Sequence, residues 1–196
     1  MPRIQFWFEF ASTYSYLSAM RIEELAVQHG VSVDWQPFLL GPIFAAQGWD
    51  NSPFNLYPAK GRYMWRDMER LSAQRGLPFK RPDPFPQNGL KAARMVLAIQ
   101  DPVQKAAFVR AVYSAEFGNG LNISDDAVLG DCLSSVGLPV EALARTQDPA
   151  IKAALIEQTS TAQSKDLFGA PSFVVGDALY WGDDRLDDAI MMASTI

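Results

Sequence analysis

The order of the predicted secondary-structure elements constrains the fold of this chain more than any other feature of the sequence. Apolar and aromatic residues up to Phe10 predict a buried strand, and a helical pattern follows from Tyr14 to a stop signal at Gly30. Alternating apolar and polar residues over 31–35 predict a second strand, whose end is marked by Pro37. The chain therefore opens with a β-α-β unit.

The end of the chain predicts a second group of strands. The segments SFVV and ALYW, joined by the turn GD, predict a β-hairpin, and an amphipathic helix begins near Asp183. Between the two ends, a Pro- and aromatic-rich stretch contains one clear helix over 60–75, and an alanine-rich helical block runs from Leu90 to about Asp166.

This order predicts an α/β protein with a thioredoxin-like fold, β-α-β followed by β-β-α, that carries a large all-helical insertion. We expect the thioredoxin-like domain to comprise residues 1–41 and 167–196. The inserted region is then 42–166, an irregular aromatic-rich segment followed by a helical domain.

Composition excludes several classes of protein. The net charge of −5 argues against a broad nucleic-acid interface, which needs a basic face. The first ten residues contain one basic side chain and an apolar run broken by Glu9, a pattern that fits neither a signal peptide nor a membrane-spanning helix. The single cysteine, Cys132, cannot form an internal disulfide. We therefore expect a cytoplasmic protein with no nucleic-acid partner and no membrane partner.

Two hydroxyls lie where the first strand meets the first helix. Ser12 and Ser15 form S-x-x-S at the point where a redox protein of the thioredoxin type carries C-x-x-C. A helix N-terminus and a hydroxyl both favour an anion, so this turn could hold the thiolate of a bound molecule. Serine is also a common N-cap, and the residues alone leave these two interpretations open. Disulfide exchange is the weakest alternative, because the turn has no thiol.

Four motifs extend over nearly the whole chain: FEFASTYSYL, PFLLGPIF, NSPFNLYPAKGRY and FGAPSFVVGDALYWGDDRL. In this order they resemble the 2-hydroxychromene-2-carboxylate isomerase and kappa-class glutathione transferase family, which is related to DsbA but lacks its catalytic cysteines. The resemblance implies glutathione as cofactor, a homodimer, and a small hydrophobic or aromatic substrate. It implies an isomerase in which the glutathione thiolate adds reversibly to a conjugated double bond.

The resemblance also assigns roles at two turns. It implies that the Ser12 hydroxyl donates to the glutathione sulfur, although Thr13 replaces the proline that commonly follows in the family. It further implies that the bond between Ala170 and Pro171 is cis, and that the backbone there pairs with glutathione as with a peptide. A simple turn proline is the alternative.

The remaining glutathione contacts come from two further motifs. Asn51 and Lys60 match a pair of family contacts, with the lysine suited to the glycine carboxylate; a solvated surface lysine is the alternative. Asp183 and Asp184 match the pair that receives the γ-glutamyl ammonium, and helix capping is the competing explanation.

Other residues complete the expectations. One or two of five aromatic residues are expected to wall a substrate pocket, and these five are Phe38, Phe44, Trp49, Tyr57 and Trp65. His29 is expected at a helix C-terminus and Cys132 in a buried, inert position. We expect no metal site.

Two alternatives to the isomerase remain. A kappa-class-like transferase would use the same sulfur site, and a non-catalytic thioredoxin-fold module would bind a peptide or protein along its cis-proline edge.

Overall fold

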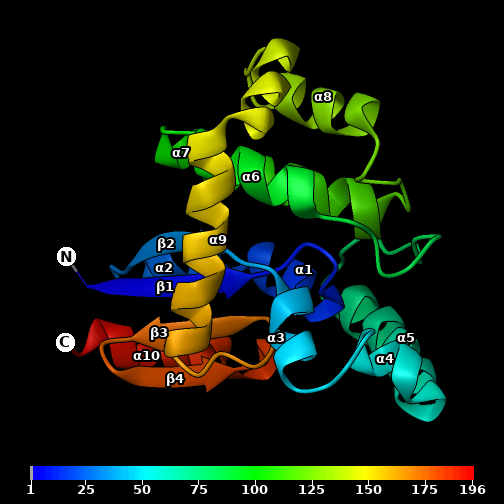
Figure 1. Cartoon of the computed structure of the whole chain (residues 1–196). Helices are drawn as coiled ribbons and strands as arrows, with labels where there is room; N and C mark the ends of the chain where they lie inside the picture. The colour runs from blue at the N-terminus through cyan, green and yellow to red at the C-terminus, as the bar shows by residue number, and fades with distance from the viewer. Residues whose placement is uncertain (1) are drawn as a thin grey trace.

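A mixed four-stranded sheet forms the centre of the molecule (Figure 1). The computed structural model describes residues 2–196. The strands are β1 (Arg3–Phe8), β2 (Ser32–Pro37), β3 (Ser172–Val175) and β4 (Ala178–Trp181), in the order β2-β1-β3-β4. β1 pairs in parallel with β2 and antiparallel with β3, and β3 pairs antiparallel with β4. This confirms the predicted thioredoxin-like arrangement of strands.

The helix expected between the first two strands is divided into α1 (Thr13–Ala19) and α2 (Ile22–Gln28). The expectation of one helix was wrong at Met20 and Arg21, where the Arg21 amide bonds back to the Ser18 carbonyl at 3.2 Å. The break accompanies two contacts of the Arg21 guanidinium, which donates to the backbone carbonyl of Asp183 and pairs with Asp187. The sequence pattern carries no sign of these distant partners.

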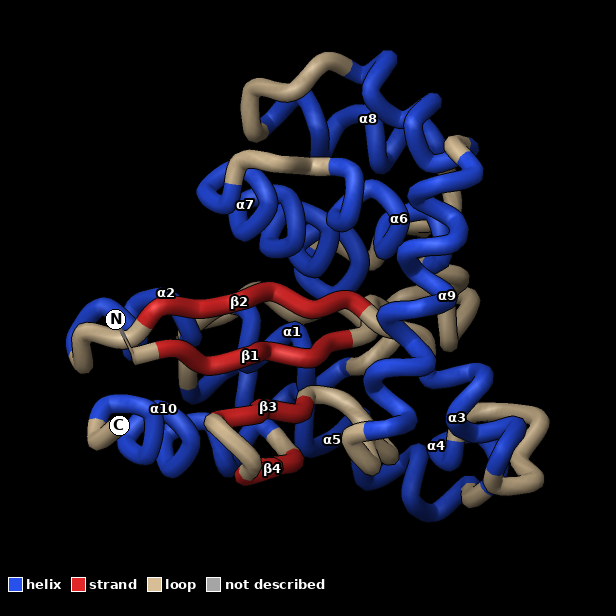
Figure 2. The backbone as a smooth tube through the Cα atoms, turned by 60° about the vertical axis from the view of Figure 1, so that its left-hand side comes forward, coloured by secondary structure: helices blue, strands red, loops and turns tan. Residues whose placement is uncertain are grey.

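The middle of the chain is more helical than predicted and forms two groups in Figure 2. Short helices over 40–46 and 53–56 lie in the segment expected to be irregular, and the second begins at Pro53 behind the N-cap Ser52. The first group lies beside one end of the sheet and comprises α3 (Leu40–Ala46), α4 (Pro53–Leu56) and α5 (Pro58–Gln74). The second group comprises α6 (Leu90–Ala98), α7 (Pro102–Tyr113), a π-helical turn (Ser114–Gly118), α8 (Asp126–Ser135) and a 3-10 helix (Val140–Gln147). From this group α9 (Pro149–Ser164) leads back to the sheet.

The chain ends on a short 3-10 turn (Asp183–Arg185) and α10 (Leu186–Ser194), which packs against β1 and β3. No helix within residues 2–196 is both long enough and apolar enough to cross a membrane.

Alternate residues of β1 supply the two faces of the sheet. Ile4, Phe6 and Phe8 are fully buried in a core that continues into the helical block, whereas Trp7 faces a smaller apolar cluster under α3 and the end of α9. The Phe6 ring lies 5.4 Å from the Phe173 ring across the sheet. Because one core joins sheet and helices, the carboxyl end of β1 is held in place on both faces. The division of the chain into two domains stays a prediction.

Candidate functional site

A cavity of about 750 Å³ opens at the carboxyl end of β1. Its walls come from the turn before α1, from the segment between α3 and α5, and from the loops before β3 and α6. Four of the residues expected in a glutathione site line this cavity: Ser12, Asn51, Lys60 and Ala170. The structure thus brings together side chains that are up to 158 residues apart in the sequence.

Ser12 is both an N-cap and a wall of the cavity. Its hydroxyl accepts hydrogen bonds from the amide (3.3 Å) and the hydroxyl (3.0 Å) of Ser15, and it donates to the backbone carbonyl of Ala170 at 2.9 Å. Ser15 is buried and therefore acts as the support of Ser12. Rotation of one hydroxyl hydrogen, from the carbonyl toward the cavity, would let Ser12 donate to a bound sulfur.

The bond between Ala170 and Pro171 is cis, as the family resemblance implied. Ala170 lines the cavity, whereas Pro171 is buried and is not part of the lining. The Pro171 carbonyl accepts from the amide of Gly182 at 2.9 Å, which fixes the loop to the end of β4.

Asn51 and Lys60 lie on the outer wall of the cavity, and both are exposed. The Asn51 side-chain oxygen accepts from the Ser52 amide at 2.7 Å and from the Asn55 side chain at 3.1 Å. The Lys60 ammonium lies 5.6 Å from the centre of the Tyr57 ring, and none of the ion pairs formed within residues 2–196 includes it. Its charge is therefore available to a carboxylate ligand.

The two aspartates of the WGDDRL motif have different environments, and neither lines the cavity. Asp183 is 5% exposed, pairs with Arg75 at 2.6 Å and accepts from the Ser18 hydroxyl at 2.9 Å. Its carboxylate thus joins α1, α5 and the start of α10. Asp184 is exposed, and no ion pair found in the described part of the chain includes it.

Aromatic side chains form much of the cavity wall. Of the five aromatic residues expected there, Phe44 and Trp49 line it and their rings lie 5.7 Å apart. Phe38 is completely buried in the core, and Tyr57 and Trp65 are outside the lining. The expectation that one or two of the five would face a substrate is consistent with this arrangement.

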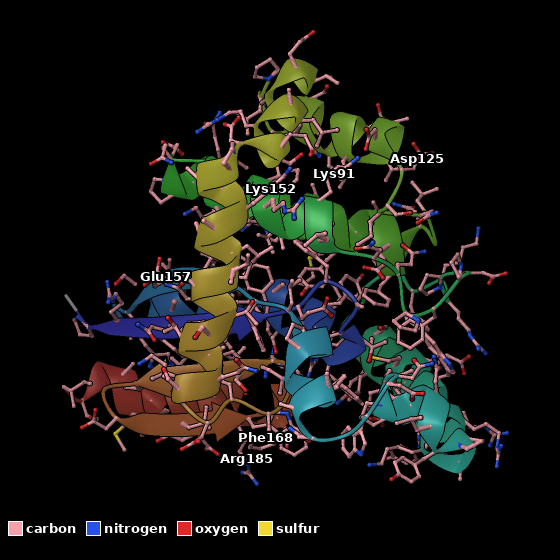
Figure 3. The ribbon with its side chains drawn as sticks, viewed as in Figure 1. Lys91, Asp125, Lys152, Glu157, Phe168 and Arg185 are labelled. Carbon is pink, nitrogen blue, oxygen red and sulfur yellow. The ribbon has the colours of Figure 1, made fainter. Side chains whose placement is uncertain are left out.

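The opposite wall contains aromatic residues that sequence reasoning missed. Phe168, labelled at the foot of α9 in Figure 3, packs against Trp181 with a ring separation of 4.9 Å. Both side chains are about half exposed. A Cβ at Gly169 would lie 2.5 Å from the Trp181 indole nitrogen, so the indole packs directly on the glycine backbone. The sequence signal was the motif FGAPSFVVGDALYWGDDRL, which begins with Phe168 and contains Trp181.

Sequence reasoning also missed Glu9 as a site residue, although it interrupts the apolar run of the first strand. Glu9 is partly buried and lines the cavity. Burial raises its carboxyl pKa to about 8, against a weaker opposing contribution from the Ala11 backbone amide. Burial, with a contribution from the charge of Glu9, also holds the pKa of the Glu116 carboxyl well above its ordinary value.

The other sequence expectations can be placed as well. His29 is the exposed C-cap of α2, as predicted. Cys132 is buried, and burial raises the pKa of its thiol to about 11, in agreement with an inert side chain. Thr13 is 1% exposed and does not line the cavity, so its hydroxyl is not a ligand contact. No group of metal-binding side chains occurs among residues 2–196.

Comparison with known proteins agrees with this geometry. Residues 3–190 match the family model described as a DSBA-like thioredoxin domain. A 2-hydroxychromene-2-carboxylate isomerase of Sphingobium xenophagum is 32% identical over 186 residues, with 94% of each chain covered. Glutathione S-transferase kappa 1 of Caenorhabditis elegans is 26% identical, covering 94% of this chain and 88% of the relative.

A solved structure of a 2-hydroxychromene-2-carboxylate isomerase superposes with a TM-score of 0.87 at 25% identity, covering 98% of this chain and 93% of the other. The chain therefore belongs to the 2-hydroxychromene-2-carboxylate isomerase and kappa-class glutathione transferase family of DSBA-like thioredoxin domains.

Proposed function

We propose that this enzyme is a glutathione-dependent isomerase that acts on a small conjugated aromatic substrate of the 2-hydroxychromene-2-carboxylate type. The observation that carries the proposal is the position of Ser12: its hydroxyl lies on the wall of a cavity that also contains Ala170, Lys60 and Asn51. The two curated relatives named above support the same reaction class, one as an isomerase and one as a glutathione transferase.

The residues of the cavity suit glutathione at three points. The unpaired ammonium of Lys60 suits a carboxylate, the exposed Asn51 offers an amide, and the Ser12 hydroxyl can donate to a sulfur. Asp184 has a carboxylate available for an ammonium, whereas that of Asp183 is already held by Arg75. We therefore assign the γ-glutamyl end to Asp184, and a positioning role to Asp183 and to the cis bond before Pro171.

Bound glutathione would supply a thiolate that adds reversibly to the conjugated double bond, so that the bond can rotate before the thiolate leaves. The chain holds that sulfur with Ser12 and stabilises its ionised form. The aromatic pair of Phe44 and Trp49 and the pair of Phe168 and Trp181 exclude water from the substrate ring.

The proposal is tested by incubating 2-hydroxychromene-2-carboxylate with the protein and a catalytic amount of glutathione, and by following formation of trans-o-hydroxybenzylidenepyruvate. We expect many turnovers per glutathione, with the free thiol recovered at the end, and none with S-methylglutathione. Consumption of one glutathione per product would identify a transferase instead. Absence of any glutathione-dependent reaction with this substrate or related enones would contradict the proposal.

We also propose a homodimer in the cytoplasm. The family resemblance supports the homodimer, and the single buried thiol of Cys132 is compatible with a reducing compartment that contains glutathione. Sedimentation equilibrium measures the oligomeric state directly, and a monomer at micromolar concentration would contradict the homodimer.

A further inference from the structure

The inner wall of the cavity contains two polar side chains that the proposed glutathione contacts do not use. Glu9 directly follows β1 and precedes the turn that carries Ser12, and Gln87 lies in the loop before α6. The Glu9 carboxyl lies beside the loop that carries Gln87, because a Cβ at Gly89, two residues further along that loop, would lie 3.7 Å from the carboxyl oxygen. Both are buried or partly buried among apolar and aromatic residues.

The Gln87 side chain is a fixed donor without an acceptor. It is 5% exposed, and its oxygen accepts the amide of Ile123 at 2.9 Å. This bond fixes the side-chain orientation, because a backbone amide can only donate. The nitrogen is then left as a buried donor with no partner among residues 2–196. A buried donor without an acceptor destabilises the folded chain, and such a cost is expected to be retained where the group has a ligand.

The Glu9 main chain is held rigidly. Its carbonyl accepts from the Ser12 amide at 3.0 Å and from the Tyr113 hydroxyl at 2.8 Å. None of the ion pairs within residues 2–196 includes its carboxyl, which therefore has no cation to stabilise its charge.

The ionisable groups around the Glu9 carboxyl are mostly acidic. Glu116 of the π-helical turn and Tyr113 of α7 interact with it from behind, and both have pKa values raised by burial. Asp50 and Lys60 lie on the walls of the same cavity. With its pKa at about 8, Glu9 is mostly protonated at pH 7 and is then a hydrogen-bond donor.

We propose that Glu9 and Gln87 form a donor pair that binds the carbonyl oxygen of an α,β-unsaturated ketone substrate. The inference rests on the proposed function for its chemistry. When the thiolate sulfur bonds to the β carbon, the alkene electron pair moves toward the carbonyl carbon and the carbonyl pair moves onto oxygen. The two donors stabilise that oxygen, and the reverse flow of electrons expels the thiolate with no net transfer of protons.

The inference has a test that needs no glutathione. The probe is trans-2-oxo-4-phenylbut-3-enoate, and its matched control is trans-4-phenylbut-3-enoate, which lacks only the keto oxygen. Binding is measured by quenching of tryptophan fluorescence, to which Trp49 and Trp181 of the cavity wall contribute. We expect the natural chain to bind the keto compound at least about tenfold more tightly than the control, as two new hydrogen bonds imply.

The variants separate the donor role from a structural one. Glu9→Gln keeps a donor but cannot ionise. Adding Gln87→Glu to it keeps the acceptor for the Ile123 amide and makes the second donor ionisable, so the double variant should lose most of the preference for the keto compound as the pH rises. The preference should fall in the natural chain as the pH rises through about 8 and stay constant in Glu9→Gln. Gln28→Glu, an exposed position on α2, is the matched control.

A preference for the keto compound that persists at high pH in the double variant, or that falls with pH in Glu9→Gln as it does in the natural chain, would overturn the donor pair. That result is independent of glutathione turnover. If the donor pair binds the keto group as expected but glutathione promotes no reaction, the proposed function fails and this inference stands.

Discussion

The Ser12 hydroxyl donates a hydrogen bond of 2.9 Å to the backbone carbonyl of Ala170, which directly precedes the cis peptide bond to Pro171. This bond connects the turn before α1 to the loop before β3, the two segments that the proposed function places around the glutathione sulfur. It also means that the hydroxyl proton already has an acceptor before any ligand arrives. A bound thiolate must compete with that carbonyl, and as a full negative charge it is the stronger acceptor.

The buried charge of Asp183 predicts a large effect on stability. Asp183→Asn removes the partner of Arg75 and weakens the bond to Ser18. We expect a loss of about 2–3 kcal/mol in the free energy of unfolding, because the buried carboxylate is neutralised and the partly exposed guanidinium of Arg75 loses its anion. Urea denaturation measures it. Asp187→Asn is the control: Asp187 pairs with Arg21 at the surface, so the loss should stay below about 1 kcal/mol. Equal losses of stability in Asp183→Asn and Asp187→Asn would contradict the role of Asp183 as a buried, paired carboxylate.

Asp184, the exposed residue next to Asp183, is expected to affect ligand binding and not stability. Asp184→Asn removes a carboxylate that none of the ion pairs within residues 2–196 uses. We expect an unchanged melting temperature and a weaker affinity for glutathione, by about tenfold if one charge-assisted hydrogen bond is lost. Titration calorimetry with glutathione and with its analogue lacking the amino group tests this. If Asp184→Asn binds both compounds as the natural chain does, the ammonium lies elsewhere.

Glu9 predicts that stability declines as the pH rises. Its carboxyl has a pKa of about 8 in the folded chain and about 4.5 when unfolded. Between these values the unfolded state holds fewer protons than the folded state, so the free energy of unfolding falls with pH. The stabilising difference is fully present below pH 4.5 and is lost by about pH 8.

Replacement by Glu9→Gln removes this dependence. From pH 5 to pH 9 the variant should lose less stability than the natural chain, by about 2 kcal/mol after allowance for partial exposure. Glu116→Gln isolates the contribution of the buried neighbour, whose pKa is also raised. Urea denaturation at several pH values makes the comparison. Parallel curves for the natural chain and Glu9→Gln would show that Glu9 titrates alike in both states.

Gly169 predicts a selective effect on the substrate pocket. In Gly169→Ala the new Cβ would lie 2.5 Å from the Trp181 indole nitrogen, so the indole must move away from Phe168. We expect a several-fold higher KM for the aromatic substrate with glutathione affinity nearly unchanged, since the loss is one of aromatic contact. The control is Gly118→Ala, outside the cavity lining, where the new Cβ meets no atom closer than 3.8 Å. An unchanged KM in Gly169→Ala would contradict an aromatic wall for the substrate.

The sheet and the helical insertion could be predicted from the sequence, because both depend on local patterns of apolar residues and turn residues. The hairpin of SFVV and ALYW and the helix over 60–75 have strong signals in periodicity and turn residues, and both are confirmed. The break in the first helix at Arg21 was not predictable, because its cause is a pair of contacts made more than 160 residues away.

The candidate site could also be predicted only in part. Motifs identified Ser12, Asn51, Lys60 and Ala170, which do share one cavity. Motifs could not reveal that Asp183 pairs with Arg75, nor that the Gln87 nitrogen has no acceptor among residues 2–196, because both facts depend on which side chains meet in three dimensions. A lone acidic residue in an apolar strand, such as Glu9, is a signal that sequence reasoning can use for an ionisable pocket residue.

A glutathione titration tests whether Ser12 holds a glutathione thiolate in this cavity. Glutathione is added to the natural chain and to Ser12→Ala, and the ultraviolet absorbance of the thiolate is recorded together with tryptophan fluorescence. We expect saturable binding to both chains, with a thiolate signal near neutral pH that Ser12→Ala largely loses. Absence of binding at millimolar glutathione, or an equal thiolate signal in both chains, would contradict this expectation and leave Ser12 as a helix cap.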